Sequence, residues 1–207
     1  MEYVNTDTKG VNFPKTLVGK RKLDIICNTC LDLFYKNGIF DTQIQDICKS
    51  ANIAVGTFYI YFQDRVTLFR FLIDNIKYHL GEYLKTELQG TQELLLNQKL
   101  MLFAKTYMRY MLDYKFAYMV AMGCAGIDRL IHNDYMRCIA KMYEEYVTQG
   151  EHPLNGSRNT APWYFLLGGI NLLYLKLADE EIADNDIDRA LEDIINRAST
   201  LTSALNK

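Results

Sequence analysis

The feature that most constrains this sequence is residues 42–69, TQIQDICKSANIAVGTFYIYFQDRVTLF, in which two short helical patterns flank one tight turn. Thr42 is expected to cap the first short helix. Asn52, which tolerates a left-handed backbone, is expected in the turn at 51–54. The second short helix is expected over 55–62. Two short helices joined in this way predict a helix-turn-helix, the motif that enters the major groove of DNA.

Helical periodicity also dominates the rest of the chain. The 207 residues include only three prolines and no useful run of strand-like alternation, so the expected fold class is all-α. A first helix is expected over 17–37, ended by Gly38, and Asp64 is expected to cap a long helix that reaches about Glu87. The further helices are expected over 91–114, 116–124, 127–148, 160–178 and 186–205.

The second short helix has two different faces. Phe58 and Phe62, four residues apart, are expected to point into the core. Gly56 leaves room for the backbone to approach a duplex, and the hydroxyl donors of this helix are Thr57, Tyr59 and Tyr61. The alternative is that Tyr59 and Tyr61 only cover the long helix that follows.

Charge is informative locally rather than over the whole chain. The net charge is −2, which is no nucleic-acid signature, but Lys15–Lys22 holds four cations and no acid. Such a local patch can bind phosphates, although a solvated start of a helix explains each of these cations about as well. Arg65 opposes the helix dipole in the first turn of the long helix, and a DNA phosphate is expected to compensate it.

These residues resemble the N-terminal signature of TetR-family transcriptional regulators over about 17–70. The matching core is Ala51-Asn52-Ile53-Ala54-Val55-Gly56-Thr57-Phe58-Tyr59-Ile60-Tyr61-Phe62, followed by Arg65 and Leu68-Phe69. The resemblance implies a homodimer that binds a palindromic double-stranded DNA operator, usually as a repressor, and releases it when a small-molecule effector binds. A cytoplasmic location is expected because five cysteines without the spacing of a disulfide framework suit a reducing compartment. The DNA-binding set carried over by position is Thr42, Val55, Gly56, Thr57, Tyr59, Ile60, Tyr61 and Arg65.

The resemblance also implies two domains, and the chain departs from the family in the first. A helix-turn-helix DNA-binding domain is expected at 1–65, and a helical effector-binding and dimerisation domain at 66–207. The family commonly has Gly at position 52 and a capping Ser at position 54, so here Asn52 caps the helix or the helix begins loosely. Val55 and Ile60 are apolar where relatives often carry polar groups, and they can touch thymine methyls but cannot hydrogen-bond to base edges.

The chain beyond Gly90 is rich in Tyr and Met, side chains that line adaptable apolar pockets. A small hydrophobic or aromatic effector is therefore expected there, although plain core packing is the better explanation for any one of these residues. The expected ligand-binding set is Tyr107, Tyr110, Met111, Tyr114, Tyr118, Met122, Trp163 and Leu167.

The last two helices are expected to form the dimer interface. The glycine pair at 168 and 169 would destabilise its helix by about 1 kcal/mol per residue relative to Ala. A close crossing of helices in a two-fold interface would compensate this cost. The expected interface set is Gly168, Gly169, Leu172, Leu191, Ile194, Ala198 and Leu201.

Several chemistries are not expected. The pair Cys27 and Cys30 lies inside the first helix, which favours packing over a metal or redox role. No cofactor, metal site, catalytic motif, secretory signal or membrane span is expected, so an enzyme is not predicted. The alternative function is a helical small-molecule carrier with a vestigial DNA-binding domain. The uncharged residues Val55 and Ile60 on the recognition surface support this alternative.

Overall fold

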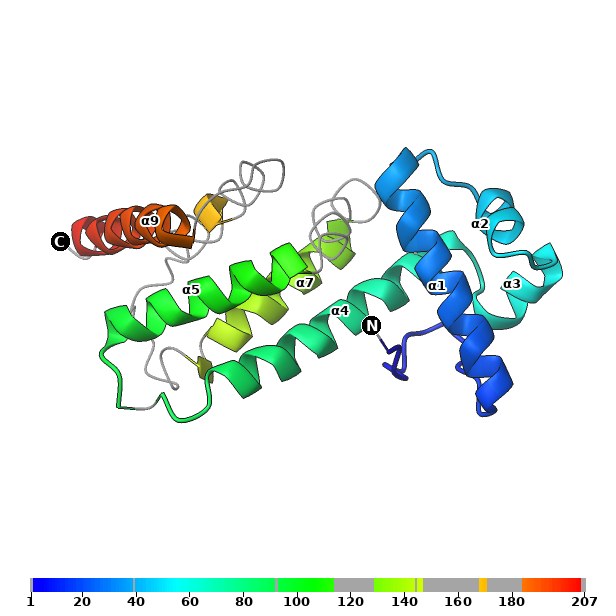
Figure 1. Ribbon diagram of the computed structural model, residues 1–207, viewed down its shortest axis with the longest axis horizontal. Helices are drawn as coiled ribbons and strands as arrows, with labels where there is room; N and C mark the ends of the chain where they lie inside the picture. Colours follow the sequence, from blue (N-terminus) through cyan, green and yellow to red (C-terminus); the bar gives the residue numbers. More distant parts are fainter. Residues whose placement is uncertain are drawn as a thin grey trace. The chain divides into compact units, whose positions relative to one another are not determined.

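The computed structural model describes residues 2–38, 40–91, 93–113, 129–143, 145–146, 168–170 and 184–205. Its labelled helices are α1 (Leu17–Asn37), α2 (Ile44–Ser50), α3 (Val55–Tyr61), α4 (Arg65–Glu87), α5 (Leu96–Asp113), α7 (Arg129–Tyr143) and α9 (Asp184–Leu205) (Figure 1). Within the described ranges the only bridge between extended segments joins Val11 and Phe62. The expectation of an all-α fold is confirmed.

The chain divides into two compact units, and α4 contributes to both. The first unit comprises Met1–His79 together with the start of α7 as far as Met136, and the second contains Leu80–Lys115 and the chain from Arg137 onward. This division by packing falls fourteen residues after the functional boundary expected at Arg65, because the first half of α4 belongs to the core of the first unit. The functional boundary at 65 stays a prediction.

The core of the first unit joins α1, α3 and α4. The apolar positions of α1 recur at helical spacing, and Leu23, Ile26 and Phe34 are fully buried. Phe34 meets Phe69 of α4 with their ring centroids 6.1 Å apart. Thr16 caps the start of α1 by accepting a hydrogen bond from the Gly19 N–H. Gly38 ends the helix with φ at 84°, as predicted.

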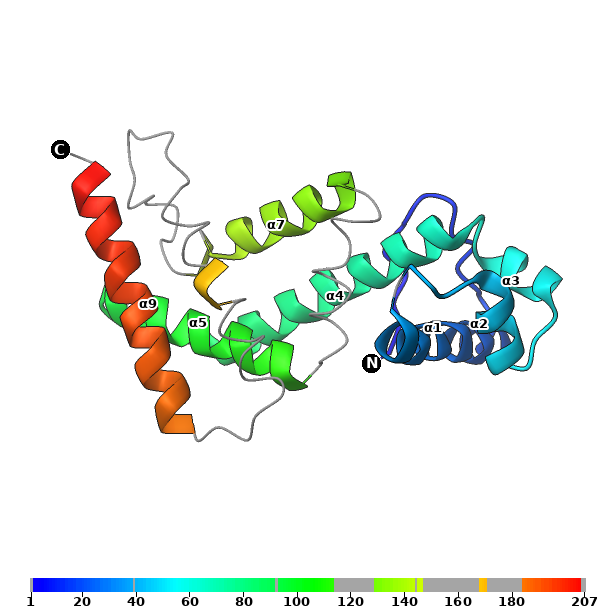
Figure 2. The same ribbon diagram turned by 90° about the horizontal axis from the view of Figure 1, so that it is seen from above.

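The N-terminal segment 2–12, which we call the strap, packs along the first half of α4, and Figures 1 and 2 show it beside that helix. The Val4 N–H donates to Oδ1 of the buried Asn75 at 2.8 Å, and the Thr8 hydroxyl donates to Asp74 at 2.7 Å. Near its C-terminal end, Asn12 donates from its backbone N–H to the Tyr61 carbonyl at 2.8 Å. The strap therefore joins α4 to the end of α3.

The second unit pairs α5 with α9, which Figure 2 shows crossing each other. Lys105 of α5 and Asp188 of α9 form an ion pair at 2.6 Å. Aromatic rings fill the interior: Phe103 stacks on Tyr107 and meets Tyr143 edge-on.

Three of the helices expected beyond Gly90 start later than predicted or lie largely outside the described residues. The helix expected at 91–114 starts later, at Leu96, because the Gln98 side chain accepts a hydrogen bond from the Leu95 N–H and caps the helix there. The helix expected at 116–124 and most of that expected at 160–178 lie outside the described residues. Among the helices that the structure describes, none combines the length and hydropathy that a membrane span requires.

Candidate nucleic-acid interface

The first helix of the predicted helix-turn-helix begins one residue later than expected. Gln43, not Thr42, is the N-cap of α2, and its backbone N–H donates to the Asp46 carboxylate at 3.1 Å. The Thr42 side chain is fully buried, and its hydroxyl donates to the Gly38 carbonyl at 2.9 Å. This hydroxyl satisfies a carbonyl at the end of α1, so the side chain is withdrawn from any DNA surface.

The turn between α2 and α3 adopts the predicted conformation. Asn52 has φ at 52°, in the left-handed region that asparagine tolerates. Helix α3 then starts at Ala54 without a side-chain cap, and the Thr57 N–H donates to the Ala54 carbonyl instead. The N-cap residue is therefore Ala54, and the alternative in which Asn52 caps the helix is wrong.

Helix α3 has a buried face and an exposed face. Phe58 and Phe62 are fully buried, as predicted, and their ring centroids lie 5.6 Å apart. The outer face of α3 consists of Val55, Gly56, Tyr59 and Ile60, in which the three larger side chains are 43%, 53% and 59% exposed. A turn from helical to extended backbone at Phe62 ends α3 at Tyr61.

The two tyrosines of α3 have different environments. Tyr59 points outward, so it does not serve as a cover for the long helix. Tyr61 is only 6% exposed, and its backbone carbonyl accepts a hydrogen bond from the strap. The folded chain therefore covers the Tyr61 side chain, which does not favour the expected contact of its hydroxyl with DNA. Thr57 lies between these extremes and is half-buried.

Gly56 occupies an open position on the outer face. A Cβ placed on this residue meets no atom within 4 Å, so packing inside the protein does not require a glycine. Glycine within a helix is less favourable than alanine by about 1 kcal/mol. The absence of a side chain here leaves the α3 backbone accessible from outside.

Arg65 is compensated by the chain itself. Its Nη1 donates to the Phe40 carbonyl at 3.1 Å and to the Thr42 carbonyl at 2.8 Å. The half-buried guanidinium thus ties the start of α4 to the segment that precedes α2. The prediction that a DNA phosphate must offset this charge is corrected, since two backbone carbonyls do so.

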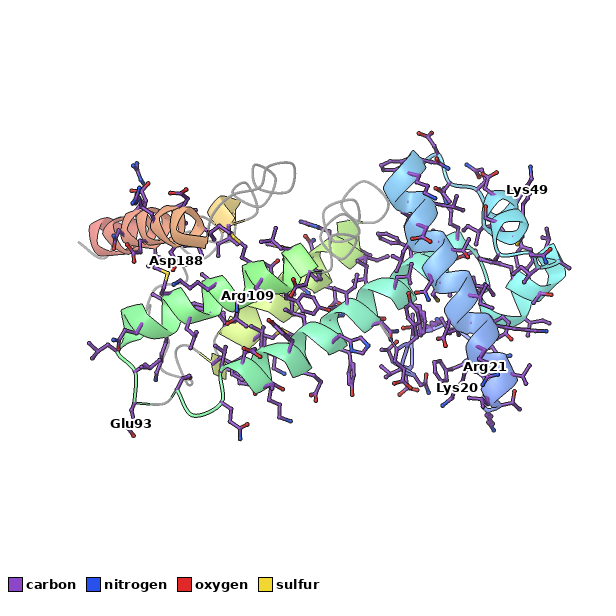
Figure 3. The ribbon with its side chains drawn as sticks, viewed as in Figure 1. Lys20, Arg21, Lys49, Glu93, Arg109 and Asp188 are labelled. Atoms are coloured by element: carbon purple, nitrogen blue, oxygen red, sulfur yellow. The ribbon has the colours of Figure 1, made fainter. Side chains whose placement is uncertain are left out.

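Exposed cations lie on α1 and α2 of the same unit. Lys49 is exposed on α2, and Lys20 and Arg21 are exposed near the start of α1 (Figure 3). Lys20 also lies over the Phe13 ring, 5.9 Å from its centroid. From 47 to 63 the sequence contains Lys49 and no carboxylate. The segment 47–63, which includes α3, therefore favours an anionic partner.

The predicted ligand-binding residues are described only in part. Tyr107, Tyr110 and Met111 are all buried in the second unit, and Tyr110 meets Tyr83 with ring centroids 5.5 Å apart. All three side chains lie in the interior of this unit. Their burial agrees both with the wall of a ligand pocket and with ordinary core packing. The predicted members that lie outside the described residues are Tyr114, Tyr118, Met122, Trp163 and Leu167.

Three of the predicted dimer residues, Gly169, Leu191 and Ile194, pack within their own chain. A Cβ on Gly169 would lie 2.8 Å from Cγ2 of Ile194, so the close approach predicted at this glycine is made to α9 of the same chain. Leu191 is fully buried there as well. Gly168 is exposed. The structure does not describe Leu172 or the side chains of Ala198 and Leu201.

The cysteines of α1 are buried. Cys27 and Cys30 are both fully buried, and burial raises the pKa of each thiol well above its usual value. This environment keeps both as thiols and agrees with the predicted packing role. Among the residues that the structure describes, no group of three or more His, Cys, Asp or Glu side chains is placed to bind a metal ion.

Comparisons of sequence match the part of the chain that carries the helix-turn-helix. Residues 26–71 match the family model described as bacterial regulatory proteins, tetR family. The uncharacterized HTH-type transcriptional regulator YvdT of Bacillus subtilis (strain 168) is 30% identical over 80 residues. That alignment covers 39% of this chain and 40% of the relative, so it spans less than half the length of either protein.

Comparisons of structure extend over most of the chain. A TetR family transcription regulator from Marinobacter aquaeolei VT8 has a TM-score of 0.64 at 18% identity, covering 86% of this chain and 94% of that one. The fatty acid degradation regulator FadR from Bacillus halodurans has a TM-score of 0.62 at 15% identity, covering 87% and 94%. At such identities the likeness shows a common fold.

Proposed function

We propose that the chain is a TetR-family transcriptional regulator, because residues 26–71 match the model of that family. In this proposal it binds a palindromic DNA operator as a homodimer and represses transcription until a small molecule releases it. The observation that carries this proposal is the exposed outer face of α3, held in place by the buried Phe58 and Phe62. A short helix with one anchored and one open face is suited to docking in a major groove.

The structure narrows the set of proposed contacts. Val55, Gly56, Tyr59 and Ile60 present the outer face to base edges and phosphates, and the half-buried Thr57 adds a hydroxyl at its margin. Thr42, Tyr61 and Arg65 act indirectly, because their polar groups already bind the protein's own backbone or are covered. In this proposal Lys49, Lys20 and Arg21 supply phosphate contacts.

The aromatic interior of the second unit is the proposed site of the effector. Phe103, Tyr107 and Tyr110 are buried there together, and a hydrophobic or aromatic molecule suits such surroundings. An acyl chain is one ligand of this chemistry, and a protein of similar fold is named a regulator of fatty acid degradation. Dimerisation is proposed through the last two helices. Gly169, Leu191 and Ile194 are removed from the proposed interface, because they pack within their own chain.

Effector and operator are proposed to communicate through α4, the helix that both units share. A molecule that binds the second unit would move this helix and change the separation of the two DNA-binding domains in the dimer. Because binding free energies are reciprocally linked, the operator must then weaken effector binding by the same factor.

Binding of the full chain to duplex DNA from upstream of its own gene tests the proposal. We expect specific binding that weakens by orders of magnitude as salt rises, because phosphate contacts release counterions. Tyr59→Ala should lower the affinity at least about tenfold through the loss of a hydrogen bond to a charged group.

Tyr78→Ala is the matched control, because Tyr78 is similarly exposed, at 48%, on α4 of the same unit. This variant should bind as the parent does. Absence of specific duplex binding at low salt, with a small molecule still bound, would instead support the carrier.

A further inference from the structure

The outer face of α3 lacks the groups that proteins use to read most bases. Its larger exposed side chains are the aliphatic Val55 and Ile60 and the phenol Tyr59. Helix α3, VGTFYIY, contains no charged residue and no amide side chain. The direct base contacts available to this helix are therefore hydroxyl hydrogen bonds and apolar contacts.

The major groove offers one apolar group that distinguishes a base. Guanine is read best by Arg or Lys, adenine by Asn or Gln, and cytosine by Asp or Glu, whereas thymine presents its C5-methyl group. Each of the first three needs a side chain that α3 does not have. An aliphatic side chain that is exposed in the free protein buries the most apolar surface when it contacts this methyl group.

We infer that Val55 and Ile60 select thymine by contact with its C5-methyl group, so that the operator half-site carries thymines where α3 lies in the groove. The inference rests on the proposed function and names the base class that this helix reads. Val55 and Ile60 are five residues apart, about 7.5 Å along the helix axis. They also lie about 140° apart around the helix, so each side chain covers the methyl group of a thymine of its own.

Charge near α3 favours DNA over a protein or a second copy of the chain as the occupant of this face. Lys49 lies in the preceding helix, no carboxylate occurs from 47 to 63, and Lys20 and Arg21 are exposed in the same unit. An aliphatic face in a unit with exposed cations complements a groove whose edges are phosphates and whose floor carries methyl groups. The open position at Gly56 lets the helix backbone approach that floor.

The test replaces thymine by deoxyuridine, which removes the methyl group and keeps the base pair. Duplexes are first selected from a random pool with the full chain, and the enriched sequence is then made again with deoxyuridine at each conserved thymine. We expect the affinity to fall about fourfold for each thymine that Val55 or Ile60 covers, as burial of one methyl group predicts.

Two variants connect the effect to the residues. Ile60→Ala and Val55→Ala should each weaken binding to the thymine duplex, and each should lose no further affinity when its own thymine is already deoxyuridine. Ile25→Ala, which shortens an aliphatic side chain that is 48% exposed on α1, should leave both affinities unchanged. All three changes are on the surface, and circular dichroism verifies that the variants fold.

The outcomes separate this inference from the proposed function. Enrichment of a duplex that binds equally well with thymine and with deoxyuridine would overturn thymine selection and leave the regulator intact. An enriched site without thymines would do the same. Failure to enrich any duplex would overturn both, and self-association of the chain through Val55 and Ile60 would then explain the exposed face.

Discussion

At the scale of single residues, Gly56 is a position where the stability of the folded protein and its affinity for DNA should respond in opposite directions to one substitution. A Cβ at this position meets no atom of the protein within 4 Å. Gly56→Ala should therefore raise the free energy of unfolding by about 0.5–1 kcal/mol, through helix propensity alone. The same methyl group should weaken DNA binding, because it holds the α3 backbone away from the groove.

Urea denaturation and fluorescence anisotropy with the selected duplex measure the two effects of Gly56→Ala. A gain in stability together with a loss of affinity is the expected result, because the glycine then serves an external contact. Unchanged affinity would mean that DNA does not approach this part of α3 closely.

Tyr143 predicts a dependence of stability on alkaline pH. Burial raises its pKa to about 12, whereas a phenol in an unfolded chain titrates near 10. Since the folded state favours the protonated phenol, its contribution to stability is complete below about pH 10 and is lost as pH rises through 12. Tyr143→Phe removes the group that titrates.

Urea denaturation at several values of pH measures this contribution. Between about pH 10 and 12 the free energy of unfolding should fall more steeply in the parent than in Tyr143→Phe. Because burial also raises the pKa of Tyr3, that residue adds to the fall in stability at alkaline pH, and the effect of Tyr143 is the difference in slope between the two proteins. Equal slopes would show that Tyr143 is solvated in solution.

At the scale of elements, the strap holds the first half of α4 and the end of α3 together. Asn75 is fully buried, with Oδ1 accepting from Val4 and Nδ2 donating to the Phe71 carbonyl. Asn75→Ala leaves the Val4 N–H without this acceptor, so it should lower the free energy of unfolding by about 1–3 kcal/mol. The strap should also open locally.

Hydrogen exchange of the amides in the strap measures this opening. In Asn75→Ala the amides of Val4 and Asn12 should exchange faster, because both donate to groups that the released strap no longer reaches. Asn5→Ala is the control, since Asn5 hydrogen-bonds only to Asp7 at the surface in the described structure. Unchanged protection of Asn12 would show that the two ends of the strap are held independently.

Much of the element structure was predictable because it depends on local sequence. Periodicity and a terminal glycine defined α1 at 17–37, and the left-handed turn at Asn52 follows from the chemistry of that one residue. The burial of Tyr61 and Thr42 was not predictable in this way. The backbone carbonyl of Tyr61 accepts a hydrogen bond from the strap, a segment without periodicity that lies about fifty residues earlier in the chain. Contacts of this kind leave no signal in the pattern of α3 itself.

At the scale of the whole molecule, Leu191 separates packing within one chain from association of two. The sequence could show that α9 has an apolar stripe, but not whether α5 of the same chain or a second chain covers it. The structure buries Leu191 completely within one chain, on the helix that pairs with α5. Part of the stripe predicted for the dimer therefore stabilises the second unit itself.

Leu191→Ala should accordingly lower the free energy of unfolding by about 2–5 kcal/mol, the usual cost of such a cavity. Because the lost contacts lie within one chain, the decrease should be the same at every protein concentration, and sedimentation should show an unaltered dissociation constant of the dimer. Ile187→Ala, at a half-buried position on the same helix, should lower the free energy of unfolding by less. A variant that remains folded but dissociates at micromolar concentration would instead place Leu191 at the two-fold interface, and the pairing of α5 with α9 would then need a second chain to complete it.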